Sequence, residues 1–152
     1  MRLFIDTNII IEYVERRKEY GSVRRILEAI HSGIHEGLVS QGSVYTLTYL
    51  AEQALKANGF HRPELTDRLR QLMTAILQLV EPIGISRSEM LNAISNHDFH
   101  DLEDSLQFQS AQENRCNILI TININDYKDA DQSRMEILTP SAFVEKYMNV
   151  EP

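Results

Sequence analysis

Short apolar runs alternate along the chain with longer stretches in which apolar residues recur at helical spacing, a pattern that predicts strands separated by helices. The predicted strands are residues 3–5, 38–40, 79–83, 117–121 and 136–138. The predicted helices are residues 9–14, 23–30, 44–55, 63–77, 86–95, 102–111 and 139–147. Strands joined through helices are typical of a parallel α/β sheet wound right-handedly.

Three details of the pattern bear on packing. The helices at 44–55 and 63–77 are separated by a short turn and are expected to form a helical hairpin. Pro82 has no backbone N–H to donate within a sheet, which places the third strand near an edge or a strand end. In the helix at 86–95 three apolar residues are expected to face the core: Met90, Leu91 and Ile94.

A carboxylate, Asp6, follows the first predicted strand directly and precedes the first helix. In open parallel sheets ligands bind in the crevice outside the carboxyl ends of the strands, so Asp6 stands where a ligand is expected. Asp and Asn are also good helix caps, and on this stretch alone a capping role for Asp6 or Asn8 stays open. The strand at 117–121 leads in the same way into polar residues: Thr121, Asn123, Asn125 and Asp126.

Asp104 lies near the start of the sixth predicted helix, and Phe108 and Ala111 follow it at offsets of four and seven residues. Its side chain is therefore expected on the face of the helix that points into the protein. An ionised carboxylate there is destabilising unless a cation meets it, and no Arg or Lys lies within a turn of Asp104 in the sequence. Mg²⁺ and Mn²⁺ prefer oxygen ligands, so we expect Asp6, Asp104 and Asp126 to meet around a divalent ion.

Length and composition set the frame for this site. With 152 residues, 43% of them hydrophobic, residues 1–152 are expected to form a single domain. The net charge of −7 argues against a protein that coats DNA, although metal ions between clustered carboxylates would permit a polyanionic substrate. With no apolar run of membrane-spanning length and no export signal, we expect a cytoplasmic protein without membrane contact. The single cysteine, Cys116, has no zinc-site neighbours and is expected to be a small buried hydrophobe.

Three segments of the chain resemble the PIN-domain family, which includes the ribonuclease toxins of bacterial toxin–antitoxin pairs. They are LFIDTNIIIEYV, DLEDSLQFQSAQENRCNILITININDY and EILTPSAFVEKY. The resemblance implies an α/β fold, a three-layer α/β/α sandwich with a parallel, Rossmann-like sheet. It also implies hydrolysis of RNA phosphodiester bonds at an acidic cluster that binds Mg²⁺ or Mn²⁺.

The resemblance assigns roles to individual residues. Asp6 matches the acid of the family's strand-one DTN motif, Asp104 the acid that heads its DAL-like helix, and Asp126 the acid after a Thr-x-Asn turn. These three are the expected catalytic and metal-binding residues. Asp101 precedes Asp104 as in a DFEDAL variant of the motif and is an expected accessory metal ligand. Three neutral side chains would orient ligands or substrate: Asn8, Thr121 and Asn123.

The sequence departs from the family pattern at one place. Family members with the full acidic set carry a Glu early in the helix after the second strand, where residues 43–47 contain no acid and Glu52 comes nearly two turns later. The resemblance thus implies a metal-dependent ribonuclease acting as a toxin, or else a catalytically degenerate PIN-fold module that binds RNA or protein. Its expected partners are RNA and an antitoxin protein, and the apolar hairpin at 44–79 suggests a homodimer.

Two other kinds of site compete with this interpretation. His97, Asp98, His100 and Asp101 have the spacing of a histidine–aspartate phosphohydrolase site, but that class is all-helical and this chain begins with a strand. A polar loop is the preferred interpretation of residues 96–100. Phosphoaspartyl enzymes also place an Asp at the first strand tip, but here no second Asp follows two residues later.

Two groups of side chains are candidate RNA contacts. One is a cluster of positive charge within ten residues: Arg16, Arg17, Lys18, Arg24 and Arg25. These side chains would contact RNA phosphates or form a solvated helix face. The other is Tyr45 and Tyr49, four residues apart on one helix, which would stack on bases or, in the preferred interpretation, pack in the core or a dimer interface.

Overall fold

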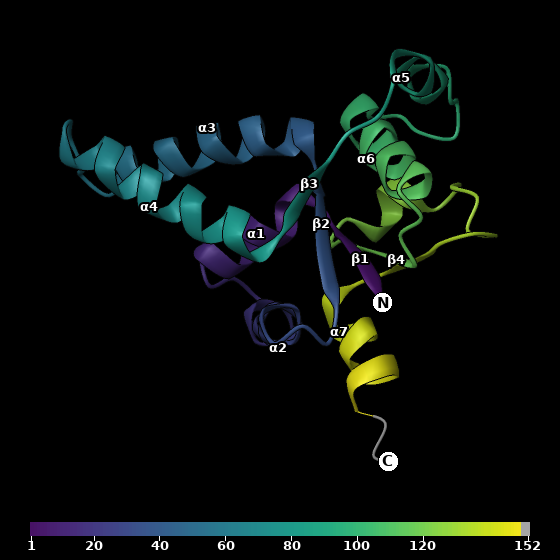
Figure 1. The fold of residues 1–152 in the computed structure, drawn as a ribbon, viewed down its shortest axis with the longest axis horizontal. Coiled ribbons are helices and arrows are strands. Elements are labelled where there is room, and N and C mark those ends of the chain that lie inside the picture. Colours follow the sequence, from purple (N-terminus) through teal and green to yellow (C-terminus); the bar gives the residue numbers. More distant parts are fainter. Residues whose placement is uncertain (150–152) are drawn as a thin grey trace.

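The computed structural model describes residues 1–149 and contains a five-stranded, all-parallel sheet in the order β3-β2-β1-β4-β5 (Figure 1). The strands are β1 (Arg2–Ile5), β2 (Glu36–Ser40), β3 (Glu81–Ile83), β4 (Ile118–Ile120) and β5 (Glu136–Leu138). The central strand β1 pairs with β2 through Phe4 and Leu38, and with β4 through Phe4 and Leu119. The predicted parallel sheet is confirmed, and Pro82 lies in the edge strand β3, as expected.

Helices connect the strands in the order that the sequence pattern predicts. They are α1 (Thr7–Val14), α2 (Tyr20–His31), α3 (Gln41–Ala57), α4 (Glu64–Leu79), α5 (Arg87–Ile94), α6 (Leu102–Glu113) and α7 (Pro140–Phe143). Two further turns complete the described chain, the 3₁₀ helix η1 (Ile124–Tyr127) and the π-helical η2 (Val144–Met148). None of the described helices is long and apolar enough to cross a membrane.

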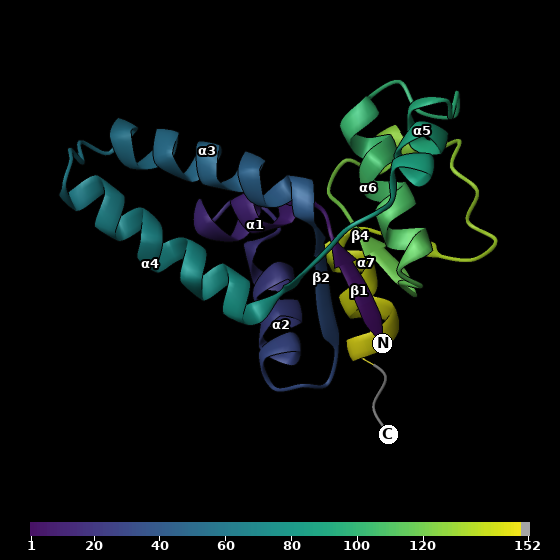
Figure 2. The same ribbon diagram turned by 45° about the horizontal axis from the view of Figure 1, so that its top comes forward.

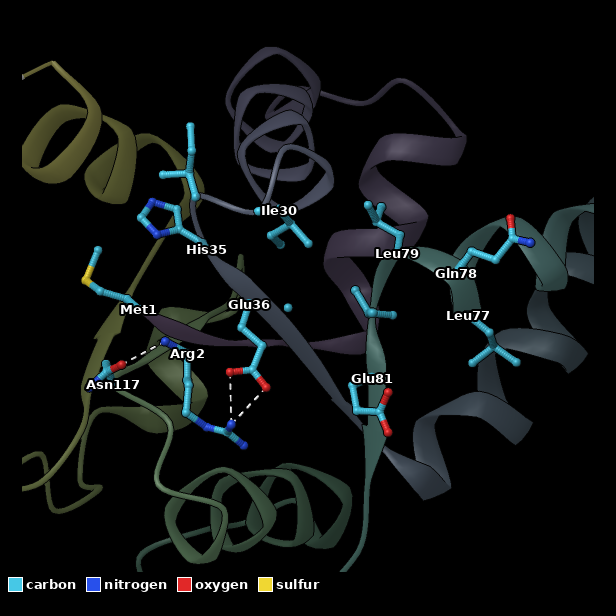
Figure 3. A pocket seen from close by; sticks show the side chains of 14 residues that line it. Met1, Arg2, Ile30, His35, Glu36, Leu77, Gln78, Leu79, Glu81 and Asn117 are labelled. Atoms are coloured by element: carbon cyan, nitrogen blue, oxygen red, sulfur yellow. Dashed lines mark hydrogen bonds and ion pairs between the residues drawn. The ribbon is translucent and has the colours of Figure 1, made fainter.

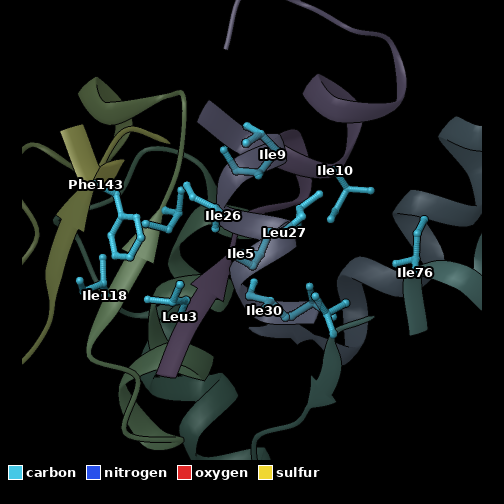
Figure 4. Close-up of a cluster of buried hydrophobic side chains, with 14 of the residues drawn as sticks. Leu3, Ile5, Ile9, Ile10, Ile26, Leu27, Ile30, Ile76, Ile118 and Phe143 are labelled. Carbon is cyan, nitrogen blue, oxygen red and sulfur yellow. The ribbon is translucent and has the colours of Figure 1, made fainter. Parts of the chain in front are cut away.

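The sheet is buried on both faces, which explains why its strands are continuous apolar runs. Leu3 and Ile5 of β1 pack against α1, α2 and α7, and Figure 4 shows this cluster with Ile26 and Phe143. Phe4 points the other way and packs with Phe108 of α6. The fold is therefore the expected α/β/α arrangement, with residues of β1 in the core of both layers.

The hairpin of α3 and α4 extends away from the sheet, as Figures 1 and 2 show from two directions. On α3 the buried side chains are Ser43, Leu47 and Ala51, and on α4 they are Leu65 and Ile76. Tyr45 and Tyr49 are 78% and 62% exposed, so they do not pack in the core of this chain. The predicted hairpin is confirmed, and it leaves aromatic surface available to a partner.

The helix α5 is oriented differently from the prediction. Met90, Leu91 and Ile94 are 45%, 56% and 51% exposed, so the expectation that they face the core is wrong. The buried residue of this two-turn helix is Ala93, whose carbonyl accepts a hydrogen bond from Ser105 Oγ of α6 at 2.6 Å. A small side chain at 93 lets the two helices approach closely, and the larger apolar residues are left outside.

Candidate active site

Asp6 directly follows β1 and is almost completely buried, with only 2% of its surface exposed. It stands at the N-cap position of α1, yet its Oδ2 accepts hydrogen bonds from side chains. Thr121 Oγ1 donates to it at 2.7 Å and Asn8 Nδ2 at 3.1 Å. Side-chain donors are thus the main hydrogen-bond partners of this carboxylate, with the Asn8 backbone as a weaker one.

The loop after β4 is tied to the same carboxylate. Thr121 Oγ1, fully buried, also accepts a hydrogen bond from the Asn123 backbone N–H at 3.1 Å. Asn8 Oδ1 accepts one from the Ile122 backbone N–H at 3.4 Å. Asn8 and Thr121 thus fix both the orientation of Asp6 and the course of the loop that carries Asn123 and Asp126.

Tyr127, which the sequence did not predict as a site residue, joins Asp6 to a second carboxylate. Its buried hydroxyl lies 3.4 Å from Asp6 Oδ2 and 3.3 Å from Asp104 Oδ1. A hydroxyl has one proton, so it donates to one carboxylate at a time. The only sequence signal is an aromatic residue directly after Asp126 in an otherwise polar run. Burial and the charges of Asp6 and Asp104 raise the pKa of Tyr127, which keeps the hydroxyl protonated.

Asp104, in the first turn of α6, is partly buried and surrounded by other acids. Burial raises its pKa from 3.8 to about 7, and the charges of Asp6, Asp101 and Asp126 add to the shift. Burial also raises the pKa of Asp6, against the hydrogen bond from Thr121. The neighbouring carboxylates therefore add to the effect of burial in destabilising the ionised form of Asp104, as expected of an acid that shares a site with other acids.

Asp101 caps α6, because its Oδ1 accepts hydrogen bonds from the backbone N–H groups of Glu103 at 2.8 Å and Asp104 at 3.2 Å. This role is structural and leaves the second carboxylate oxygen available for a ligand. Glu103 also lines the cleft, and burial followed by the charges of Asp101 and Asp6 raises its pKa. Gln107, one turn later and buried, accepts a hydrogen bond from the Thr7 backbone N–H at 3.3 Å. It links α6 to the start of α1.

These residues line one cleft of about 530 Å³ at the carboxyl end of the sheet. The predicted site residues that line it are Asp6, Asn8, Asp101, Asp104, Asn123 and Asp126. Thr121 lies beneath the cleft as the partner of Asp6. The structure thus places these predicted residues along one cleft, with Asp126 exposed on η1, but within residues 1–149 it does not gather three acids closely enough to share one ion, as the sequence had suggested.

The α3 side of the cleft carries neutral side chains. Thr46, Leu50 and Gln53 line it, and no acid of α3 does so in the part of the chain that the structure describes. Glu52 turns elsewhere, with Oε1 at 3.0 Å from both Lys56 Nζ and Arg62 Nη2. Among the described residues, therefore, α3 brings no acid to the cleft, in agreement with the sequence.

A larger hollow of about 690 Å³ lies at the opposite, amino end of the strands (Figure 3). An ion pair crosses it, with Arg2 Nη1 at 2.8 Å from Glu36 Oε1, and Asn117 Oδ1 accepts the Arg2 backbone N–H at 2.7 Å. These polar groups satisfy one another, and ligands of open α/β sheets bind at the other end. We therefore place the functional site at the acidic cleft.

The acidic cleft fits a divalent cation by its chemistry. Asp6 and Asp104 both accept from the Tyr127 hydroxyl, so their carboxylates lie close together. Carboxylate oxygens are the ligand atoms that Mg²⁺ and Mn²⁺ prefer. Among residues 1–149 no three Asp, Glu, His or Cys side chains stand close enough to hold one ion together. Mg²⁺, however, commonly takes only one or two carboxylates and completes its shell with water and phosphate. A cation between Asp6 and Asp104 would also relieve the repulsion that raises the pKa of Asp104.

The histidine–aspartate alternative finds no support in the described residues. His97, Asp98, His100 and Asp101 are all exposed, and they form no cluster that could hold a metal within residues 1–149. Asn96 Oδ1 instead accepts the Asp98 backbone N–H at 3.0 Å, as in a polar turn. Cys116 is buried as predicted, and burial raises the pKa of its thiol to about 12.

A parallel sheet with an acidic cleft beyond its carboxyl end defines an α/β protein with a site for cations or polar ligands, and comparison with known proteins gives the family. The PIN-domain model matches residues 2–125. The chain belongs to the PIN-domain family, which confirms the resemblance seen in its motifs.

Individual relatives are distant in sequence but match over nearly the whole chain. Ribonuclease VapC1 of Aquifex aeolicus (strain VF5) is 23% identical over 151 residues, 96% of this chain and 95% of the relative. A chain of VapBC2 from Rickettsia felis, solved bound to a DNA fragment from its promoter, superposes with a TM-score of 0.66 at 15% identity, covering 91% of this chain and 98% of that one. A chain of VapBC-1 from nontypeable Haemophilus influenzae gives 0.63 at 14% identity, covering 93% and 99%. These two structures confirm the fold.

Proposed function

We propose that the protein is a metal-dependent ribonuclease that hydrolyses RNA phosphodiester bonds in the acidic cleft. The observation that carries the proposal is the pair Asp6 and Asp104, which share the Tyr127 hydroxyl at the carboxyl end of a PIN-domain sheet. Asp6 and Asp104 would hold Mg²⁺ or Mn²⁺ directly, and Asp126, with Asp101 as an accessory ligand, would contribute from the cleft wall through metal-bound water. The similarity to a ribonuclease, VapC1, supports the same reaction class.

The residues of the chain would act by orientation and charge. Asp6 is held in one direction by Thr121 and Asn8, so its outward oxygen is fixed before a ligand arrives. Asp104 adds a second carboxylate whose position α6 sets, and Asn123 offers a neutral contact at the cleft wall. A bound divalent ion would lower the pKa of a water and stabilise the charge that develops on the phosphate.

The biological role we propose is that of the toxin of a toxin–antitoxin pair. The similar structures from Rickettsia felis and Haemophilus influenzae are chains of VapBC assemblies, and the similar sequence is a VapC protein. An antitoxin would block the acidic cleft. A small gene of antitoxin type directly beside this one, with a product that co-purifies with this chain and suppresses RNA cleavage, is the expected finding.

A second function is favoured by the neutral wall on α3. Thr46, Leu50 and Gln53 stand where an additional acid would help to hold a second ion, and Glu52 is engaged with Lys56 and Arg62. A cleft with too few acids would bind RNA or protein without cutting it. The alternative is thus a PIN-fold binding module that has lost catalysis.

Cleavage of a mixed RNA pool distinguishes the two functions. The parent protein is expected to cut RNA with Mg²⁺ or Mn²⁺ and to stop when a chelator is added. Asp6→Asn and Asp104→Asn keep the size of each side chain but remove its charge, so each is expected to lower the rate at least about 100-fold. Asp98→Asn, an exposed acid outside the cleft, is the matched control and should cleave like the parent. RNA binding without chelator-sensitive cleavage would support the binding module instead.

A further inference from the structure

The acidic cleft is lined by one basic side chain, Arg17, among the described residues. The acidic side chains that line it are Asp6, Glu15, Asp101, Glu103, Asp104 and Asp126. A metal ion would neutralise part of this charge, but an RNA strand also brings phosphates on either side of the scissile bond. A fixed cation beside the acids is therefore the feature that a polyanionic substrate requires.

The loop between α1 and α2 holds Arg17 at this place. The Arg17 backbone N–H donates to the Glu12 carbonyl at 3.0 Å, and its own carbonyl accepts from Tyr20 N–H at 3.1 Å. Glu12, a buried acid, accepts the Glu19 backbone N–H at 2.6 Å and closes the loop from below. Arg16 takes the left-handed conformation, with φ of 51°, that the tight turn requires. The loop is thus anchored on both sides of Arg17.

In the structure the guanidinium of Arg17 is occupied by Glu15, another residue of the cleft wall. Arg17 Nε donates to Glu15 Oε2 at 2.6 Å, and the two side chains are 50% and 39% exposed. An exposed ion pair of this kind contributes little to stability, so replacing the Glu15 carboxylate by another anion costs little free energy. Arg17 Nε and Nη2 both contact a single oxygen of Glu15, Oε2, whereas a backbone phosphate offers two oxygens that can accept two parallel hydrogen bonds from the guanidinium.

The other basic residues of the same run are placed elsewhere. Arg24 Nε donates to Glu28 at 2.7 Å and Arg25 Nη2 to Asn149 at 3.0 Å, and neither arginine lines the cleft. The Arg16 guanidinium lies 5.7 Å from the centre of the Tyr20 ring. Lys18 does not line the cleft either, so Arg17 is the one of the five candidates that does so among the described residues.

We propose that Arg17 binds a backbone phosphate of the RNA strand next to the scissile one, and that Glu15 occupies the guanidinium until the strand arrives. Arg17 is then a substrate-positioning residue, and Glu15 is a competitor of the substrate. This inference rests on the proposed ribonuclease function, because it assigns the substrate of the same cleft.

Substituting Arg17 and substituting Glu15 should change RNA affinity in opposite directions. If the ion pair were purely structural, the two substitutions would have the same effect on RNA affinity. Binding of a fluorescent single-stranded RNA is measured by anisotropy with Mg²⁺ in an Asp6→Asn background, so that the strand is not cut. Arg17→Ala should weaken binding about five- to tenfold and reduce the slope of log K against log salt by about 0.7, the value for one phosphate of a single strand. Glu15→Gln should tighten binding about twofold or more, because it removes a competing anion. Arg24→Ala, which breaks a comparable exposed pair outside the cleft, should leave both quantities unchanged.

In the active protein, Arg17→Ala should raise KM more than it lowers kcat. Equal RNA binding by Arg17→Ala and Arg24→Ala would overturn the inference. Weaker RNA binding by each of the single variants Glu15→Gln and Arg17→Ala would overturn it too. If the protein cleaves RNA in a chelator-sensitive way while Arg17 has no effect, only this inference fails. If it neither binds nor cleaves RNA, the proposed function fails and the inference with it.

Discussion

At the scale of single residues, the site consists of carboxylates held close together by neutral hydrogen-bond donors such as Thr121 and Tyr127. The sequence predicted Asp6 and Asp104, because one follows an apolar strand and the other lies in line with the buried face of a helix. It did not predict Tyr127, since a buried tyrosine has no periodic signature and its contacts join residues more than 100 positions apart in one case. For the same reason the sequence could not choose Arg17 from its basic neighbours.

The raised pKa of Asp104 predicts how the metal-free protein responds to pH. The folded state binds the Asp104 proton more tightly than the unfolded chain does, with a pKa of about 7 against 3.8. The contribution of this group to stability is therefore complete below 3.8 and is lost as pH rises through about 7. In chelator, lowering the pH from 8 to 5.5 should raise the free energy of unfolding of the parent relative to Asp104→Asn by about 1 kcal/mol, allowing for solvent screening.

Urea unfolding of both proteins at the two pH values measures this difference. The comparison with Asp104→Asn is needed because other groups titrate in the same range. Asp6 and Glu103 have raised pKa values and act in the same direction. Burial and the positive N-terminus lower the pKa of His35, which therefore acts in the opposite direction as the pH falls. An identical pH dependence in parent and variant would show that Asp104 does not lie in a negatively charged, partly buried place.

At the scale of elements, the hydrophobic pattern predicted the strands and helices with boundaries that shift by a few residues. It succeeded where burial is complete, as in β1 and β4, because those strands are apolar on both faces. It failed on α5, where the rule that apolar residues point inward conflicts with a close helix approach at Ala93. A helix of two turns offers too few positions for the pattern to distinguish a core face from an exposed apolar face.

The orientation of α5 makes a pair of substitutions informative. Ala93→Leu inserts a larger side chain where α5 meets α6 and should lower the free energy of unfolding by about 1–3 kcal/mol. Leu91→Ser removes a larger apolar side chain that is 56% exposed, and should change stability by no more than about 0.5 kcal/mol. Urea unfolding at low protein concentration tests both. A larger loss for Leu91→Ser than for Ala93→Leu would mean that α5 packs with its opposite face.

At the scale of the whole molecule, strand order creates the cleft. Asp6 and Asp126 follow neighbouring strands, β1 and β4, and α6 brings Asp101 and Asp104 to the same edge. Spacing in the sequence allowed this convergence, and the PIN-domain resemblance predicted it. The sequence also predicted that α3 lacks an acid at the cleft. Only the structure shows that Glu52 pairs with Lys56 and Arg62 and does not line the cleft.

The exposed aromatic surface of the α3–α4 hairpin supports the proposal of a homodimer. Tyr45 and Tyr49 are the most exposed large hydrophobic side chains on the hairpin and stand one helical turn apart. Light scattering after size exclusion should give a dimer at micromolar concentration, and the double variant Tyr45→Ser/Tyr49→Ser should shift it toward monomer. Leu91→Ser/Ile94→Ser on α5 is the control with comparable apolar exposure. Dissociation by the α5 variant alone would place the interface there, and a monomer at all concentrations would remove the homodimer.

We infer that Asp6 and Asp104 share a divalent cation in the folded protein. The most direct measurement is the melting temperature of the parent, Asp104→Asn and Asp98→Asn with and without Mn²⁺ or Mg²⁺. A ligand that binds only the folded state stabilises it by mass action, by about 2.7 kcal/mol at a concentration 100 times its Kd. We predict that metal clearly raises the melting temperature of the parent and of Asp98→Asn, and raises that of Asp104→Asn much less. No rise in the parent, or an equal rise in Asp104→Asn, would contradict it.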